Sequence, residues 1–179
     1  TRNMSKAPID ITITKLEMTS RPSRRPVLPH GHDKGRVMLL RLNKPPLHFY
    51  RYLYETVGKA HVWVERRRMN DETLAQAVQH DDVHIYVLYC DGAPAGYFEL
   101  DFRKQPNAEL AYFGLMPDVI GRGLGSFLLA TAIETAWSKP IERLWVHTNT
   151  LDHPRALPLY QKLGFAPYAQ ERTSIIPID

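Results

Sequence analysis

PDVIGRGLGSFLL, at residues 117–129, is the stretch that decides the fold prediction, because it joins an expected strand to an expected helix through a glycine-rich turn. Gly121, Gly123 and Gly125 alternate with larger residues, so side chains are absent where the backbone must approach another group closely. Consecutive amide N–H groups of such a turn point outward, and the helix N-terminus adds a partial positive charge. The segment therefore predicts a phosphate-binding cradle, with Arg122 placed to add a charge.

Two common nucleotide-binding motifs do not fit this spacing. A Walker loop requires lysine and then serine or threonine after its last glycine, but Ser126 and Phe127 follow Gly125. A dinucleotide fingerprint requires G-x-G-x-x-G, and here the glycines fall at alternate positions with no repeated strand–helix–strand order downstream. A glycine-rich turn that merely begins a helix remains the simpler alternative.

Apolar periodicity around this turn predicts the other elements. The expected strands span residues 9–18, 37–42, 83–90, 94–102, 108–115, 143–148 and 173–177. The expected helices span residues 47–63, 70–79, 122–138 and 154–163. Asp91-Gly92 predicts a hairpin with a loop slightly longer than two residues, Asn70 or Asp71 is the expected cap of the second helix, and residues 20–36 predict an irregular loop. This order indicates a mixed α/β (α+β) sheet with helices on both faces.

Length and composition predict a single domain over residues 1–179. Hydrophobic residues make up 44% and charged residues 23%, close to an ordinary globular protein. We expect a cytoplasmic protein without a membrane partner, because no apolar run approaches about 20 residues and no charged-then-apolar leader opens the sequence. The single cysteine, Cys90, excludes an internal disulfide framework, fits a reducing compartment and is expected in the core.

The charge pattern excludes little by itself. The net charge is +4 and the pI about 9.2, with basic stretches at residues 21–25 and 65–68. Such stretches could contact nucleic acid or the phosphates of a cofactor, but a solvated face explains them more simply. The aromatic-basic interleaving of an RNA-binding sheet is absent, and no histidine and cysteine positions have metal-ligand spacing. Neither nucleic acid nor a metal is therefore an expected partner.

Two segments resemble the GNAT superfamily of N-acetyltransferases. PDVIGRGLGSFLL is similar to its motif A, whose core is Q/R-x-x-G-x-G/A, and HPRALPLYQKLGF, at residues 153–165, is similar to its motif B, N-x-x-A-x-x-x-Y-x-x-x-G-F. The positions that match motif B are Ala156, Tyr160, Gly164 and Phe165. Ile120 replaces the first residue of motif A and His153 replaces the asparagine of motif B. The motifs together, in this order, are a specific signal.

The resemblance implies a mostly antiparallel sheet of about six or seven strands, with a splayed strand pair where acetyl-CoA binds as co-substrate. Residues 83–165 would form the acetyl-CoA-binding core, residues 1–82 the acceptor side, and residues 166–179 a terminal strand. The residues implied to hold acetyl-CoA are Phe113, Gly114, Leu115, Gly121, Arg122, Gly123, Leu124, Gly125, Ser126, His153 and Ala156.

Acetyl transfer to an amine requires loss of an amine proton, polarisation of the thioester carbonyl and protonation of the departing thiolate. The resemblance implies Tyr160 as the acid for the thiolate and Glu109 as the base, acting through water. Glu99, Tyr112 or a water chain could replace Glu109, and Tyr160 could be a packing residue and Glu109 a surface charge. The strand histidines His84 and His147 are expected to be structural.

The expected acceptor is a small-molecule or peptide amine. An aromatic-walled pocket is one hypothesis for the cluster His48, Phe49, Tyr50, Tyr52 and Tyr54, and a core-facing helix stripe is the other. Trp63, Glu65 and Arg66 could add polar groups to its rim. The predicted function is acetyl transfer from acetyl-CoA to a primary amine by direct attack in a ternary complex, and a homodimer is possible. Transfer of a longer acyl or aminoacyl group and a non-catalytic coenzyme A sensor remain alternatives.

Overall fold

The structure is a computed structural model that describes residues 6–29, 31 and 36–178, so residues 30 and 32–35 of the expected loop lie outside the described residues. The described residues form one seven-stranded mixed sheet, which bears out the predicted fold class. Its strands, in their order across the sheet, are β2 (Val37–Leu42), β3 (Val83–Cys90), β4 (Ala93–Lys104), β5 (Asn107–Leu115), β6 (Arg143–Asn149), β1 (Ile9–Met18) and β7 (Ala166–Ile175). The helices are α1 (Leu47–Gly58), α2 (Asp71–Val78), α3 (Leu124–Trp137) and α4 (Ala156–Lys162), with short 3-10 helices η1 (Lys59–His61) and η2 (Pro117–Val119).

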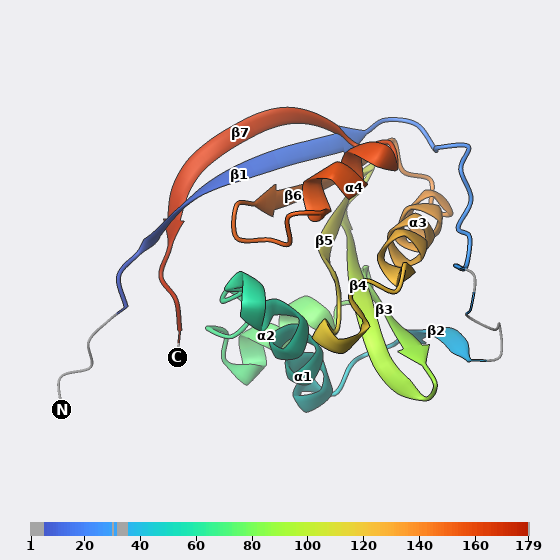
Figure 1. The fold of residues 1–179 in the computed structure, drawn as a ribbon. Coiled ribbons are helices and arrows are strands. Elements are labelled where there is room, and N and C mark those ends of the chain that lie inside the picture. Colours follow the sequence, from blue (N-terminus) through green and yellow to red (C-terminus); the bar gives the residue numbers. More distant parts are fainter. Residues whose placement is uncertain (1–5, 30, 32–35, 179) are drawn as a thin grey trace.

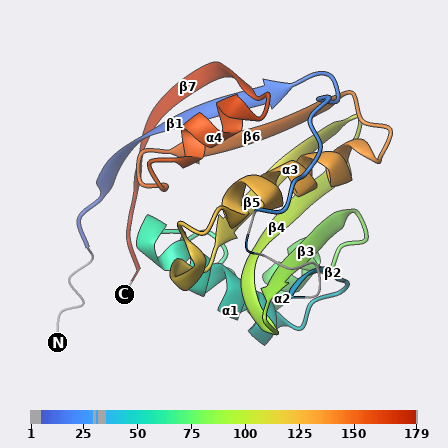
Figure 2. The same ribbon diagram turned by 45° about the vertical axis from the view of Figure 1, so that its right-hand side comes forward.

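Helices cover both faces of the sheet, as expected. In Figures 1 and 2, α1 and α2 lie on one face of the β3–β5 half, while α3 lies on the opposite face with α4 beside it. The apolar face of α3 is buried in the core, in the pattern that its sequence predicts. α2 begins at the expected cap, where the Asn70 side chain accepts a hydrogen bond from the Thr73 amide at 2.8 Å.

The first half of the sheet is an antiparallel meander. β3 and β4 join through a two-residue turn, with Cys90 paired to Ala93 and positive φ at Asp91 (52°) and Gly92 (85°). This is the backbone of a tight type I′ hairpin, for which an Asp-Gly pair is well suited. The expectation of a slightly longer loop was therefore wrong, because β4 begins one residue earlier than its apolar pattern suggests.

β5 and β6 are parallel and separate along their length. They pair only over Asn107–Glu109 and Arg143–Trp145, while β5 remains hydrogen-bonded to β4 as far as Leu115. Because β5 follows β4 beyond Glu109, an opening forms between β5 and β6. This is the splayed pair that the resemblance implies.

The N-terminal strand lies far from the strand that follows it in sequence. β1 pairs antiparallel with β6 on one edge and with β7 on the other, and Figure 1 shows β1 and β7 as a long curved ribbon. β7 begins at Ala166, although the sequence predicts a strand only near residues 173–177. Nearly every β7 side chain is exposed, so no apolar alternation marks the earlier part of this strand.

Candidate active site

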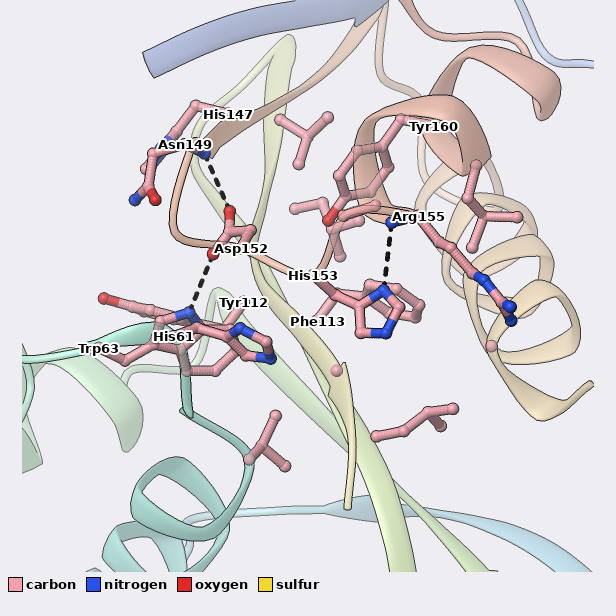
Figure 3. A pocket seen from close by; sticks show the side chains of 18 of the residues that line it. His61, Trp63, Tyr112, Phe113, His147, Asn149, Asp152, His153, Arg155 and Tyr160 are labelled. Atoms are coloured by element: carbon pink, nitrogen blue, oxygen red, sulfur yellow. Dashed lines mark hydrogen bonds between the residues drawn. The ribbon is translucent and has the colours of Figure 1, made fainter. Parts of the chain in front are cut away.

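A cavity of about 850 Å³ lies at the opening between β5 and β6. One part, which we call the glycine half, is lined from residues 120–126 and 155–162. The other part, which we call the aromatic half, is lined from residues 54–68 and 174–176 and by Tyr112. Figure 3 shows side chains from both halves facing one space.

The glycine half is built on the turn that decides the fold. Gly121 and Gly123 have positive φ values of 88° and 80°, a conformation that side-chain-bearing residues rarely adopt. They line the cavity together with Gly125 and Ser126, and no side chain caps the N-terminus of α3 in the described structure. The start of α3 therefore offers outward backbone amides to an anion. Two predicted cofactor-binding residues are not among the lining residues: the Leu124 side chain is buried in the core, and Arg122 is exposed.

The end of β5 forms the floor of the cavity. Phe113, Gly114 and Leu115 all line it, as their predicted role requires. A Cβ at Gly114 would lie 2.4 Å from Cγ1 of Val57, so glycine at this position lets α1 lie directly against the strand. That contact brings the aromatic half next to the opening.

Tyr160 enters the cavity from α4. Its ring makes edge contacts with Phe113 and Phe165, at centroid distances of 6.2 and 5.7 Å, and the side chain is nearly buried. Burial and then the negative charge of Asp152 raise the pKa of the Tyr160 hydroxyl. The hydroxyl therefore stays protonated at neutral pH and is able to donate.

Hydrogen bonds join the loop between β6 and α4 to the aromatic half. The Asp152 carboxylate accepts hydrogen bonds from the Asn149 amide at 2.9 Å and from Trp63 Nε1 at 3.4 Å (Figure 3). It also accepts one from Thr148 Oγ1 at 2.6 Å. His61 Nδ1 lies 3.1 Å from the carbonyl oxygen of Leu151 in the same loop. The sequence analysis did not identify Asp152, although it directly precedes the second motif.

The motif B positions also reach the cavity. His153 and Ala156 both line it. His153 Nδ1 accepts a hydrogen bond from the Arg155 amide at 3.1 Å, which leaves Nε2 as the ring nitrogen for a ligand. The His153 ring lies edge-on to His61, with centroids 6.4 Å apart.

Glu109 does not line the cavity itself, but it lies beside the lining residue His147. Glu109 Oε1 is 3.9 Å from His147 Nε2, and His147 lines the cavity. Burial, and then the carboxylates of Asp101, Glu99 and Glu65, raise the pKa of Glu109 from 4.5 to about 7. A carboxyl group with this pKa exchanges a proton readily near neutral pH. The sequence analysis expected a structural role for His147, and its side chain lies in the cavity lining.

The two rivals of Glu109 already have hydrogen-bond partners. Glu99 is fully buried, where it accepts hydrogen bonds from Tyr50 at 2.6 Å and from Arg66 at 2.7 Å. The Tyr112 hydroxyl donates to Glu65 at 3.0 Å, and burial raises its pKa. His84 fulfils the structural expectation, since its Nε2 lies 3.0 Å from the Asp81 carbonyl.

The aromatic wall differs from the expected cluster. Of the five residues of the cluster at 48–54, Tyr54 lines the cavity, while Tyr50 is buried against Glu99, and Phe49 and Tyr52 stack on each other. Arg66 also lies in the interior and not on the rim. The wall is instead built from rings drawn from three segments, with centroids 5.0–5.5 Å apart: Tyr54, Trp63 and Tyr112.

Within the part of the chain that the structure describes, no group of histidine, cysteine and acidic residues is arranged to hold a metal ion. The same residues include no helix with the length and apolar character needed to span a bilayer.

Solved structures with a similar fold come from several organisms. A GCN5-related N-acetyltransferase from Kribbella flavida is 17% identical, with a TM-score of 0.63 over 97% of this chain and 60% of that chain. An aminoglycoside acetyltransferase from an uncultured soil metagenomic sample is 14% identical, with a TM-score of 0.58 over 73% of this chain and 89% of that chain. An IAA acetyltransferase from Bacillus cereus is 24% identical, with a TM-score of 0.56 over 74% and 79% of the two chains. This chain thus spans less than two thirds of the Kribbella flavida protein.

Sequence comparison identifies the family. Curated protein sequences include no significant match to this chain. A family model described as Acetyltransferase (GNAT) family, however, matches residues 45–165, well over half of the sequence. This region contains the aromatic wall, the opening between β5 and β6, the glycine turn and Tyr160. The chain therefore belongs to the GNAT acetyltransferase family.

Proposed function

We propose that this protein is an acetyl-CoA-dependent N-acetyltransferase in which a primary amine attacks the bound thioester directly. The observation that carries the proposal is the single cavity that joins the glycine turn, the opening between β5 and β6, and the aromatic wall. Such a cavity can hold both substrates at once, so no covalent enzyme intermediate is needed.

The residues present fit acetyl-CoA. The amides from Gly121 to Ser126 would hold the pyrophosphate, because the N-terminus of α3 has no side-chain cap in the described structure. The pantetheine arm would lie along Phe113–Leu115, where β5 has left β6 and its backbone groups can bind a ligand. His153 and Ala156 would contact the same arm from the side of α4.

The reaction requires two proton transfers. As the amine nitrogen bonds to the carbonyl carbon, the carbon–sulfur bond breaks, and Tyr160 would give its hydroxyl proton to the thiolate of coenzyme A. The amine proton would pass to Glu109 through His147 or water, because Glu109 contacts the lining residue His147 but does not line the cavity itself. The raised pKa of Glu109 suits it to accept this proton near neutral pH.

Two measurements test the proposal. Acetyl-CoA at about 100 times its Kd should stabilise the folded protein by about 2.7 kcal/mol, visible as a rise in Tm. Release of free coenzyme A thiol should then depend on addition of an amine. No rise in Tm at millimolar acetyl-CoA would contradict the cofactor assignment, and a rise without thiol release from any amine would favour a coenzyme A sensor.

A further inference from the structure

We propose that the acceptor is a small primary monoamine with an apolar body, whose ammonium group is received by Glu65. This inference rests on the proposed function and narrows its acceptor class. It comes from the walls, the charges and the closure of the aromatic half, which are considered in turn.

The walls of the aromatic half are apolar. The rings of Tyr54, Trp63 and Tyr112 form one side. Further apolar lining comes from Val57, Val62, Val64, Ile175 and Ile176. Burial of a hydrocarbon body against such an apolar surface is favourable, and the surface offers few hydrogen-bond partners to hydroxyl groups. It therefore suits an alkyl or arylalkyl body better than a sugar.

The charges of the aromatic half suit one cation. Glu65 and Asp152 are the carboxylates among the described lining residues. Asp152 already accepts three hydrogen bonds, from Thr148, Asn149 and Trp63, whereas Glu65 has an acceptor contact with the Tyr112 hydroxyl and is exposed to the cavity. Glu65 is thus the carboxylate that can receive an ammonium group.

A second cation meets an unfavourable environment. Arg68 lines the same half, three residues beyond Glu65, and its guanidinium donates to the carbonyl oxygen of Ile176. A second ammonium in this space would lie near that guanidinium, and Asp152, the remaining carboxylate among the described lining residues, already accepts three hydrogen bonds. An unpaired charge removed from water is costly, so a diamine or polyamine should bind much more weakly than a monoamine.

Two features of this half favour a small acceptor that stands near the base. The Arg68–Ile176 hydrogen bond joins the residue that follows β7 to the segment after Trp63, so the two segments that line this side of the cavity are held together. Glu65 is also close enough to Glu109 for its charge to contribute to the raised pKa of that carboxyl. An ammonium held at Glu65 is thus near the group that would take its proton.

The sharpest test compares n-hexylamine with 1,6-diaminohexane, which share one chain and differ by a second ammonium. Coenzyme A release should give a kcat/KM for the monoamine at least about tenfold higher than for the diamine. An aminoglycoside and a short peptide with a free N-terminus serve as further acceptors. A diamine, aminoglycoside or peptide preferred to the monoamine would overturn the proposal.

Variants test which residues distinguish the monoamine from the diamine. Glu65→Gln should lower kcat/KM for n-hexylamine by about tenfold, with the acetyl-CoA-induced rise in Tm retained. Ile176→Glu adds a carboxylate at a half-exposed lining position and should raise the diamine-to-monoamine ratio severalfold. Leu40→Glu, at a similarly exposed position on β2 far along the sheet, is the matched control and should leave the ratio unchanged. If Ile176→Glu leaves the ratio unchanged as well, the charge argument fails.

The acyl donor separates this proposal from the alternative of a longer acyl group. Acetyl-CoA and hexanoyl-CoA are compared with the same amines, because the apolar half could hold an acyl chain. Faster transfer from hexanoyl-CoA with no preference among amines would overturn the acceptor class while leaving transferase activity intact. Absence of thiol release with every donor and amine would instead contradict the proposed function.

Discussion

The two halves of the cavity are built in different ways. The glycine half uses backbone geometry over one short stretch, in which Gly121 and Gly123 adopt positive φ and α3 follows directly. The aromatic half uses side chains from distant stretches, including Tyr54, Tyr112 and Ile176. Backbone geometry that depends on consecutive residues leaves a sequence pattern, whereas a wall assembled from distant residues does not. The proposed cofactor class can therefore be predicted from the sequence, whereas the proposed acceptor class requires the fold.

The largest expected effect concerns the buried ion pair of Arg66 and Glu99, which lies behind the aromatic half. Arg66→Met would leave the Glu99 carboxylate buried without its cation, although Tyr50 would still donate to it. We expect a loss of about 3–5 kcal/mol in the free energy of unfolding, measured by urea denaturation. The exposed pair of Lys15 and Glu171 gives the control, and Lys15→Met should cost less than about 1 kcal/mol. Equal losses in the two variants would contradict this account of the interior.

Tyr160→Phe tests the glycine half without disturbing its shape. Loss of the hydroxyl removes the proposed donor to the thiolate, while the ring contacts with Phe113 and Phe165 remain. We expect kcat to fall by about tenfold to a hundredfold, with acetyl-CoA still raising Tm as in the parent protein. Unchanged kcat, measured with saturating amine, would assign Tyr160 to packing alone.

The elements near the glycine turn are predictable because their contacts are local. The strand, the turn and α3 follow one another, and the apolar face of the helix has the spacing that burial requires. The hairpin at Asp91-Gly92 is likewise local. The positions of Phe113–Leu115 and of the motif B residues follow from resemblance to the GNAT superfamily, and all of these except Gly164 and Phe165 line the cavity.

The rest depends on contacts between distant residues. The insertion of β1 between β6 and β7 follows from pairing across more than a hundred residues, and the exposed β7 has no apolar alternation. The face of α1 that meets the cavity is set by the approach of Val57 to Gly114, so the aromatic cluster could not be divided into wall and core from spacing alone. The bond between Asp152 and Trp63 is equally long-range.

Glu109 lies beside the lining residue His147, and its titration gives the next prediction. Because the proposed base must be deprotonated, kcat/KM should rise with pH and level off above a pKa of about 7. Glu109→Gln should lower kcat/KM about tenfold or more at pH 8 and flatten this part of the profile. A profile in Glu109→Gln with the same pKa and the same plateau would show that another group takes the proton.

The ionisation of Glu109 should also affect the folding stability. Its contribution to stability should fall as the pH rises, whereas kcat/KM should rise. The pKa is raised in the folded state, from 4.5 to about 7, so the folded state binds this proton more tightly than the unfolded state. The contribution of Glu109 to stability is therefore fully present below pH 4.5 and is lost as pH rises through about 7. Glu109→Gln should accordingly raise Tm relative to the parent protein at pH 8, and less at pH 4. A lower Tm at pH 8 would contradict the assigned cause of the shift.

The smallest expected effect concerns the glycines themselves. Gly123 has a φ of 80°, and a Cβ there would lie 3.2 Å from Cγ of Pro29, whereas a Cβ at Gly125 meets only ordinary contacts, the nearest at 3.6 Å. Gly123→Ala should cost about 1–2 kcal/mol of folding free energy and weaken acetyl-CoA binding, because the amides of the turn would shift. Gly125→Ala, in the first turn of α3, should leave stability unchanged or raise it by up to about 1 kcal/mol. Titration calorimetry of both variants with acetyl-CoA tests whether the turn binds through its backbone conformation. Equal acetyl-CoA affinities in Gly123→Ala and the parent protein would show that the positive φ at this position is not needed for the pyrophosphate.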